Sequence, residues 1–298
     1  SKAFRFRSMF ATLLGALPRP PSSGGASSEA LLETVVRAQE AAGLDPVTDG
    51  GLLVDEDAVE AWRATAALTD RAVKAVLLGP FSHDRSDATA DSLNRVIREL
   101  AAAGCPLVEI HEPATTRIRT DGDRARFREL QQRLLDDVTG THLSLAITGG
   151  DASAAGVETL LAAPYASLAV DLIAGPANWD LVVRTPGDRG VVCGALPAQA
   201  GTDDGPELIV WAAGYATSTG GRGPDRVGIG TASSLAHLQW DVAVAKMQRL
   251  GEALRIAVAP PDERRAALDP RALDSRSAAL GQEDARASRP PRPGREST

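Results

Sequence analysis

Short runs of strand-forming residues alternate with helical patterns eight times between residues 10 and 258. The expected strands are residues 10–14, 46–48, 75–78, 107–110, 142–147, 168–172, 191–195 and 227–229. The helices expected after them are residues 28–42, 55–69, 88–103, 121–138, 154–163, 177–183, 206–216 and 235–258. Eight strand–helix units in about 250 residues have the count and length of a closed parallel barrel. We therefore predict an α/β chain that forms a single (β/α)8 TIM barrel.

A doubly wound open sheet is the main alternative for such an alternation. Sheets of that kind which bind dinucleotides carry Gly-x-Gly-x-x-Gly after the first strand. Residues 15–20 read Gly-Ala-Leu-Pro-Arg-Pro and do not fit that pattern. The barrel is therefore favoured, and we expect no nucleotide cofactor.

Charge and hydropathy exclude two classes of partner. The formal net charge is −7, and no cluster of Lys and Arg is interleaved with aromatic residues, which argues against a nucleic-acid partner. Apolar runs such as 74–78 and 208–213 fall far short of the ~20 residues that span a membrane. The two cysteines, Cys105 and Cys193, are far apart in the chain, as expected for buried reduced thiols in a cytoplasmic protein.

Composition divides the chain into three parts. Residues 1–8 are expected to be an N-terminal extension and residues 9–259 the barrel. Residues 260–298 are rich in Arg, Asp, Ser and Pro, and such a segment buries too little apolar area to offset its ordering entropy. We predict a disordered tail there, with a short helix near residues 262–268 as the alternative at its start.

Four motifs lie at the expected carboxyl ends of strands, where barrels of this kind build their active sites. They are Leu-Gly-Ala-Leu-Pro-Arg-Pro at 14–20, Ala-Gly-Leu-Asp-Pro-Val-Thr-Asp-Gly at 42–50, Leu-Gly-Pro-Phe-Ser at 78–82 and Val-Glu-Ile-His-Glu-Pro-Ala at 108–114. The ordered set resembles the catalytic barrel of the cobalamin-independent methionine synthase family, within the wider uroporphyrinogen decarboxylase-like group. That family reads Gly-Ser-x-Pro-Arg, Gly-Leu-Asp-x-x-Thr-Asp-Gly, Gly-Pro-x-Thr and Ile-Asp-Glu-Pro-Ala at these places.

The resemblance implies a zinc site that activates a thiol for attack on the methyl group of a folate. The family supplies His-x-Cys after the fifth strand, Glu after the sixth and Cys after the eighth. The matching residues here are His142 and Ser144, then Asp171, then Ser233. Because a serine hydroxyl is a poor zinc ligand, a remnant of His142 and Asp171 would hold zinc weakly. Ser144 and Ser233 are then candidates for contacts with substrate.

Three further positions also differ from the residues that the family has there. Ala16 stands where the family has Ser, Gly51 where it has Glu, and His111 where it has Asp. In the family these positions help to hold the amino-acid substrate. The methionine synthases also carry an additional N-terminal barrel, so we expect a stand-alone barrel of the catalytic type here.

His111 and Glu112 are the first candidates for chemistry, since a histidine and a carboxylate at a barrel mouth can act as a general acid–base pair. The alternative for His111 is that it caps a strand. His142 is expected to face the same mouth as a metal ligand, an acid–base group or a satisfied core histidine. A buried carboxylate such as Asp171 is costly unless it is paired, which leaves a site role and a structural role open.

Two more side chains are candidates for substrate contacts. Arg19 could bind a carboxylate through two hydrogen bonds, or it could be an ordinary surface arginine. Asp49 lies in Thr-Asp-Gly, where the favoured interpretation is that its carboxylate stabilises a turn by accepting from its own backbone.

Three functions remain open from the sequence. The first is a methyl or alkyl transferase that acts on a small thiol or amine with weakened or lost zinc dependence. The second is a metal-free acid–base enzyme, such as a lyase or decarboxylase, which uses His111, Glu112, His142 and Asp171. The third is an inactive homologue that binds a ligand at the mouth. All three imply a small-molecule partner, and none assigns an oligomeric state.

Overall fold

The computed structural model describes residues 8–21, 27–202 and 204–269. Seven parallel strands form one curled sheet in the order β1-β7-β6-β5-β4-β3-β2. The strands are β1 (Phe10–Thr12), β2 (Lys74–Leu78), β3 (Leu107–His111), β4 (His142–Ile147), β5 (Ser167–Asp171), β6 (Gly190–Leu196) and β7 (Val227–Thr231). The fold is therefore α/β with a parallel sheet curled like a TIM barrel. In the described residues this sheet has seven strands and ends at β1 and β2, so the closed eight-stranded barrel that the alternation predicts is met only in part.

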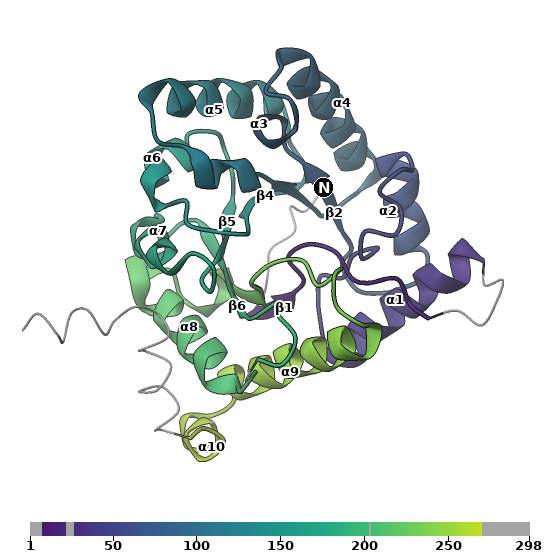
Figure 1. Cartoon of the computed structure of the whole chain (residues 1–298), viewed down its shortest axis with the longest axis vertical. Helices are drawn as coiled ribbons and strands as arrows, with labels where there is room; N and C mark the ends of the chain where they lie inside the picture. Colours follow the sequence, from purple (N-terminus) through teal and green to yellow (C-terminus); the bar gives the residue numbers. More distant parts are fainter. Residues whose placement is uncertain (1–7, 22–26, 203, 270–298) are drawn as a thin grey trace, which may run out of the picture.

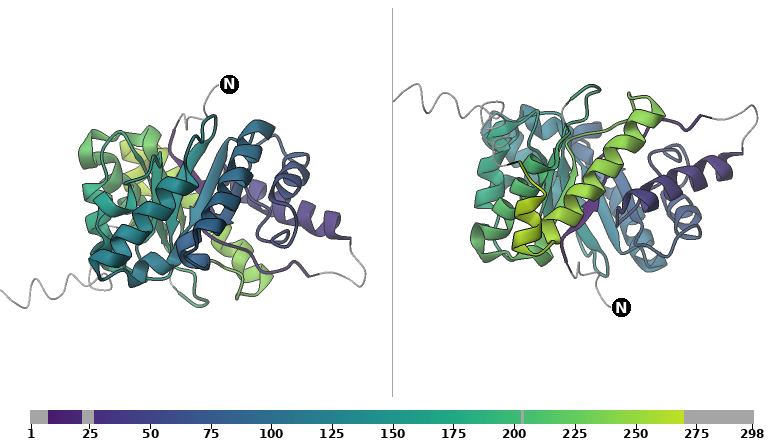
Figure 2. Two further views of the ribbon diagram at one scale, coloured as in Figure 1. Left: turned by 90° about the horizontal axis from the view of Figure 1, so that it is seen from above. Right: turned by 90° about the horizontal axis from the view of Figure 1, so that it is seen from below.

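Helices surround this sheet in a ring (Figure 1), and the side views show them packed along its outer face (Figure 2). The α-helices are α1 (Ser28–Ala42), α2 (Ala58–Ala66), α3 (Pro80–His83), α4 (Asp87–Ala103), α5 (Asp121–Leu134), α6 (Val157–Leu160), α7 (Trp179–Arg184), α8 (Pro206–Ser218), α9 (Trp240–Val258) and α10 (Pro261–Ala266). In the described part of the chain no helix combines the length and the apolarity that crossing a membrane requires.

Local signals in the sequence set several helix ends. The side chains of Ser27, Ser86 and Thr120 accept backbone N–H groups in the first turns of α1, α4 and α5, as N-caps do. Gly43 and Gly104 follow α1 and α4 with φ of 85° and 96°. Glycine adopts this left-handed conformation without a Cβ clash, so it ends a helix cheaply.

The structure does not form the second expected strand, at residues 46–48. Only Val47 pairs with its neighbour, through an isolated parallel bridge to Val73. Beyond it, the buried amide of Gln39 in α1 donates to the carbonyl of Thr48 (2.7 Å) and accepts from the Thr48 N–H (2.9 Å). Because α1 takes both backbone groups of Thr48, the chain leaves the sheet at the position where a strand would continue.

The two faces of the curled sheet carry different residues. A small cluster fills the inside of the curl, and its members are Phe10, Leu14, Ala146, Ala169 and Val192. The large core lies between the sheet and the helices, and residues such as Val108, Ile110 and Phe127 belong to it. This alternation follows from the period of two in a strand, which sends successive side chains to opposite faces.

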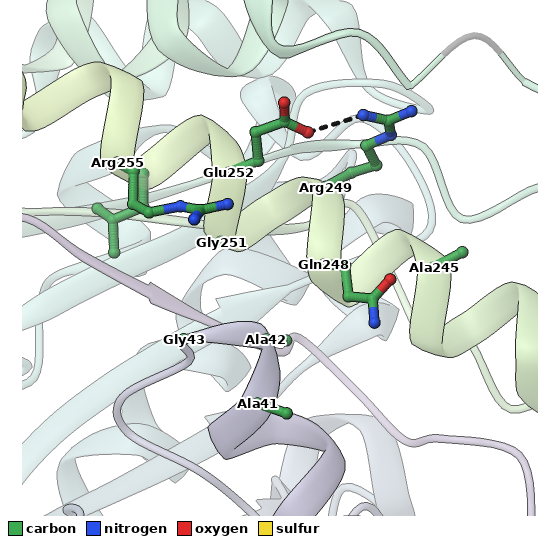
Figure 3. A pocket seen from close by; sticks show the side chains of 10 residues that line it. Ala41, Ala42, Gly43, Ala245, Gln248, Arg249, Gly251, Glu252 and Arg255 are labelled. Atoms are coloured by element: carbon green, nitrogen blue, oxygen red, sulfur yellow. Dashed lines mark hydrogen bonds and ion pairs between the residues drawn. The ribbon is translucent and has the colours of Figure 1, made fainter.

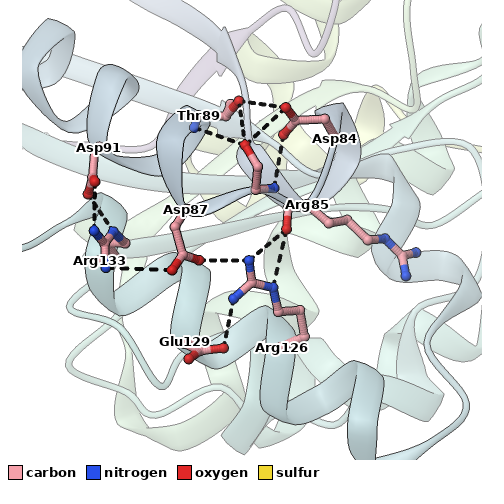
Figure 4. A network of polar contacts seen from close by, with 9 residues as sticks. Asp84, Arg85, Asp87, Thr89, Asp91, Arg126, Glu129 and Arg133 are labelled. Atoms are coloured by element: carbon pink, nitrogen blue, oxygen red, sulfur yellow. Dashed lines mark hydrogen bonds and ion pairs between the residues drawn. The ribbon is translucent and has the colours of Figure 1, made fainter.

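Ion pairs also join neighbouring helices at the surface. Figure 4 shows Arg126 and Arg133 of α5 directed at Asp87 and Asp91 of α4. Their side chains are between about one third and one half exposed. Exposed pairs of this kind contribute little individually, at most about 1 kcal/mol each.

The chain ends differ in part from the expected domains. Within the segment expected to be disordered, residues 261–266 form α10, which agrees with the short helix considered there. The backbone N–H of Asp269 then donates to Glu207 of α8 at 3.3 Å. Residues 1–7 of the expected extension and 270–298 of the expected tail lie outside the described residues.

Candidate functional site

A cavity of about 440 Å³ lies beside β2 and reaches the carboxyl ends of the first strands. Lys74, Val76, Leu78 and His111 line it, together with residues of the loop that follows residue 48. Val76 and Leu78 are 37% and 47% exposed, which is unusual for apolar side chains of a sheet. An apolar cavity with a few convergent polar groups is the usual form of a small-molecule site.

A buried cluster of three ionisable side chains borders this cavity. The Lys74 ammonium lies 2.8 Å from both carboxylate oxygens of Glu109, and the His111 Nε2 lies 2.7 Å from Glu109 Oε1. Lys74 and Glu109 are buried, whereas the His111 side chain is 12% exposed. We call these three residues the K-E-H cluster.

Electrostatics keep Glu109 ionised within this cluster. Burial by itself raises the pKa of Glu109, but the charge of Lys74 and the hydrogen bond from His111 outweigh it and lower that pKa to about 2. Burial lowers the pKa of Lys74, and the neighbouring carboxylate opposes this shift. The pair therefore carries two charges that nearly cancel, held apart from water.

The geometry assigns the ring nitrogens of His111. An ionised carboxylate can only accept hydrogen bonds, so Nε2 carries the proton that is donated to Glu109. Within the described chain Nδ1 makes no hydrogen bond, and the ring lines the cavity. In this tautomer Nδ1 carries the lone pair, which no group of the described chain uses.

Glu112, the other half of the expected acid–base pair, has a different environment. It is fully buried, and its carboxylate accepts from the backbone N–H groups of Phe81 (3.1 Å) and Ser82 (2.7 Å) and from the Gln131 amide (2.6 Å). Burial raises its pKa, and these hydrogen bonds act in the opposite direction. Glu112 thus anchors α3 to α5 and does not line the cavity.

Asp171 is the last residue of β5 and is also held by backbone groups. Its Oδ1 accepts from the N–H groups of Ile173 (2.9 Å) and Ala174 (2.8 Å), and its Oδ2 accepts from Gly149 (3.0 Å). Burial raises its pKa, although these three hydrogen bonds oppose the shift. The carboxylate fastens two loops together at the carboxyl edge of the sheet.

His142 and Ser144 are not at the expected end of the sheet. His142 is the first residue of β4, so it lies at the amino end, where its Nε2 is 2.8 Å from the Ser167 hydroxyl. The β4–β5 register pairs Ser144 with Ser167, which places Asp171 six residues farther along, or about 20 Å away. The expectation that His142 and Asp171 share a site is therefore wrong. Ser144 is buried, and its hydroxyl has no partner in the described chain.

The remaining candidates fall at the rim. Ser233 is half-buried in the loop after β7, but its neighbour Ser234 makes the tertiary contacts, at 3.2 Å from both the N and O of Ala16. Asp49 lines the cavity and accepts from the N–H groups of Gly51 and Leu53, which is the expected turn. Arg19 is exposed and does not line the cavity.

A second cavity, of about 590 Å³, lies on the outside of the ring between the end of α1 and α9 (Figure 3). Its wall is made largely of small residues, and Arg249 and Arg255 of α9 project beside it. It is far from the strand ends that form the mouth and holds no acid–base pair comparable to the K-E-H cluster.

Comparison with known proteins gives the same family from sequence and from structure. No protein-family model matches the chain. A 5-methyltetrahydropteroyltriglutamate–homocysteine methyltransferase of Parvibaculum lavamentivorans is 28% identical over 186 residues, 57% of this chain and 24% of that protein. Its counterpart in Rhodopseudomonas palustris is 27% identical over 239 residues, 68% of this chain and 29% of that protein.

Among solved structures, the B12-independent methionine synthase of Shewanella sp. W3-18-1, in complex with selenomethionine, superposes with a TM-score of 0.72 at 15% identity. The match covers 88% of this chain and all of that one. The chain resembles the cobalamin-independent methionine synthases. A protein from Listeria monocytogenes described as a vitamin-B12-independent methionine synthase has a TM-score of 0.67 at 13% identity, covering 86% of this chain and all of that one. The methionine synthase-like chain spans only about a quarter of the length of its curated relatives.

The expected zinc ligands are not brought together in the described part of this methionine synthase-like chain. In the described residues no three His, Cys, Asp or Glu side chains come close enough to hold a metal ion. The residues directly after β4 are Thr148 and Gly149, and the loop after β7 offers serines. Cys193 points away, since its Sγ lies 3.8 Å from the Ala212 carbonyl of α8.

Our sequence analysis missed Lys74 and Glu109, the two buried charges of the site. A signal for them was present, because each is a charged residue inside a run of strand-forming apolar residues. A buried charge requires a partner, and facing strands offer the nearest one. The pattern does not reveal which lysine meets which glutamate, since that depends on the register of β2 against β3.

Proposed function

We propose that the cavity beside β2 binds a small organic substrate and that His111 is the group that transfers a proton there. One observation carries this proposal: Glu109 holds Nε2 of a histidine ring that lines the cavity, while Nδ1 has no hydrogen-bond partner in the described chain. A base oriented by a carboxylate, with its second nitrogen open to substrate, is the usual arrangement of a general acid–base histidine.

The chemistry of the K-E-H cluster follows from its charges. When Nδ1 takes a proton from the substrate, the ring becomes an imidazolium, and Glu109 already lies 2.7 Å from its other nitrogen. Lys74 keeps Glu109 ionised throughout, as the lowered pKa of that carboxyl indicates. In a lyase-type step the bond to the leaving group breaks as His111 takes the proton, and the imidazolium then protonates the departing group. In a decarboxylation His111 takes the carboxyl proton, the C–C bond breaks with loss of CO2, and the imidazolium returns the proton to the carbon that remains.

A methyl or alkyl transfer is the second candidate, and the similarity to named methyltransferases favours it. In that reaction His111 would remove the proton from a thiol or amine acceptor, which then attacks the alkyl group of the donor. The bond between that alkyl group and the rest of the donor breaks, and the imidazolium protonates the departing group. The proposed step activates the acceptor with a base in place of the zinc ion that the family resemblance implies. Both candidates thus depend on the same side chain.

The experiment that tests the proposal is a proton-exchange assay. A panel of small thiols, amines and carboxylic acids is incubated with the protein in D₂O with EDTA present, and loss of substrate C–H signals or formation of products is followed by NMR. We expect His111→Gln to lower the rate by about 10²-fold or more, as for other acid–base groups. The matched control is His237→Gln, an exposed histidine that does not line the cavity, which should leave the rate unchanged. Equal rates for His111→Gln and the parent protein would refute the proposed role.

A further inference from the structure

The strand β2 has a free backbone edge that faces the cavity. The N–H of Lys74 donates to the Val47 carbonyl, and the N–H of Gly79 donates to the His111 carbonyl of β3. Backbone groups of a strand point to alternate sides, so Ala75 and Leu77 face β3, whereas Val76 and Leu78 face the other way. On that other side the pairing ends with the single bridge at Val47.

The free edge has two donors and three acceptors. They are the N–H groups of Val76 and Leu78 and the carbonyls of Lys74, Val76 and Leu78, for which no partner occurs in the described chain. A continuing second strand would take them, but Gln39 holds the backbone of Thr48 and turns the chain away. Unpaired groups along a strand are a template for another extended backbone.

The cavity follows this edge. Residues from both faces of β2 line it, including the inner Val76 and Leu78 and the outer Ala75 and Leu77. A single cavity can contact both faces of a strand only by passing around its edge. The ligand space therefore lies directly against the unpaired donors and acceptors.

Apolar side chains surround the same edge. Six large hydrophobic residues are exposed in the described part of the chain, and three of them, Val54, Val76 and Leu78, line this cavity. Exposed apolar surface beside an ordered row of donors and acceptors suits a ligand in which apolar groups alternate with hydrogen-bonding groups. The volume of about 440 Å³ is that of a small-molecule site and is too small for a folded partner.

We propose that the ligand of this cavity carries a peptide-like amide between apolar groups, of the size of an N-acyl amino acid amide or a dipeptide. The amide pairs with the edge of β2 at Val76 as an added strand would, and the apolar groups contact Val54 and Leu78. This inference rests on the proposed function only in placing the substrate near His111, which lines the same cavity.

Hydrogen exchange of the two edge amides tests the inference directly. In the ligand-free protein, the N–H groups of Val76 and Leu78 should exchange quickly, while those of Ala75 and Leu77 are protected by pairing with β3. Saturation with N-acetyl-L-leucine amide should slow exchange at Val76 and Leu78 by about tenfold or more. Protection of both amides without ligand, or no added protection at millimolar ligand, would overturn the proposal. So would protection only by a peptide too long for the cavity.

A pair of substitutions separates the hydrogen bond from the side chain. Val76→Pro removes the N–H that faces the free edge and leaves the pairing of β2 with β3 intact, since proline is tolerated at such a position. Val76→Ala keeps the N–H and shortens the side chain, so it measures the loss of the apolar contact alone. We expect Val76→Pro to bind N-acetyl-L-leucine amide about tenfold more weakly than Val76→Ala. Equal affinities would contradict the proposed pairing.

The two proposals fail separately. Protection of the edge amides requires no turnover, so it should persist in His111→Gln. If protection is seen while the exchange assay shows no dependence on His111, the acid–base proposal fails and the ligand class holds. If His111 governs turnover while no amide ligand protects the edge, the ligand class fails alone.

Discussion

At the residue scale, the sequence alone does not distinguish a buried structural carboxylate from a catalytic one. Glu112 follows β3 and Asp171 ends β5, yet each accepts only from uncharged donors, which are mainly backbone N–H groups of the adjoining loops. Glu109 has charged partners instead, and it links Lys74 to the one histidine that lines the cavity from β3. The type of donor separates the structural carboxylates from the one that orients a base.

His142 makes the stability of the fold depend on pH. Burial lowers its pKa to about 4, against about 6.5 for a histidine in the unfolded chain, and the charge of Glu109 opposes this shift. The unfolded state therefore binds a proton first, so the contribution is complete above pH 6.5 and is lost as the pH falls toward 4. It amounts to about 3 kcal/mol.

We expect His142→Gln to flatten this dependence, because glutamine can keep a hydrogen bond to Ser167 but does not titrate. Urea unfolding at pH 7, 5.5 and 4.5 measures it. The exposed His237→Gln is the control and should retain the slope of the parent protein. Identical pH slopes for the two variants would show that His142 is not the group responsible.

At the scale of elements, the approach of α9 to α1 depends on one glycine. A Cβ at Gly251 would lie 1.7 Å from the carbonyl oxygen of Ala42, so the two helix backbones are in direct contact there. Gly214 of α8 is a helical glycine with open space around its Cβ position. The same substitution should therefore have opposite effects at the two positions.

We expect Gly251→Ala to destabilise the protein by about 2–3 kcal/mol, since the overpacking cost exceeds the gain in helix propensity. Gly214→Ala should stabilise it by about 0.5–1 kcal/mol. Chemical denaturation of both variants measures the difference. A stabilised Gly251→Ala protein would mean that α1 and α9 can separate without loss.

At the scale of the whole molecule, one buried guanidinium joins several elements. Arg222 donates to the backbone carbonyls of Thr185 (2.8 Å), Arg189 (3.0 Å) and Ala216 (2.8 Å). These carbonyls belong to the turn after α7, the loop before β6 and the end of α8. A single side chain therefore holds together the amino end of the second half of the sheet.

Removing this guanidinium should lower the stability of the whole fold. Arg222→Met removes a donor from the buried carbonyls of Thr185, Arg189 and Ala216, which should cost about 3–5 kcal/mol and lower the Tm by about 10 °C. Arg249→Met is the control, because Arg249 makes only an exposed pair with Glu252 and its loss should change the Tm by less than about 2 °C. Calorimetry distinguishes the two outcomes. A cooperative transition at the parent Tm in Arg222→Met would contradict the structural role.

Much of the fold could be predicted because its signals are local. The amphipathic pattern and the flanking Ser27 and Gly43 define α1, and the bounds observed are those expected. Seven of the eight expected strands are present, with ends shifted by a few residues at most. The strand predicted at 46–48 does not form because the backbone of Thr48 pairs with Gln39 of a helix and not with the sheet. The periodicity of the sequence cannot predict such a contact.

The candidate site could be predicted only in part, because much of it depends on contacts between distant segments. Sequence alone determined the strand–helix alternation and placed His111 at a strand end, because both depend on residues that are neighbours along the chain. The tertiary structure decided that Lys74 and Glu109 meet, that His142 lies at the opposite end from Asp171, and that β2 keeps a free edge. Those outcomes depend on strand register and on contacts between distant segments, and a shift of one residue turns every side chain of a strand to its other face.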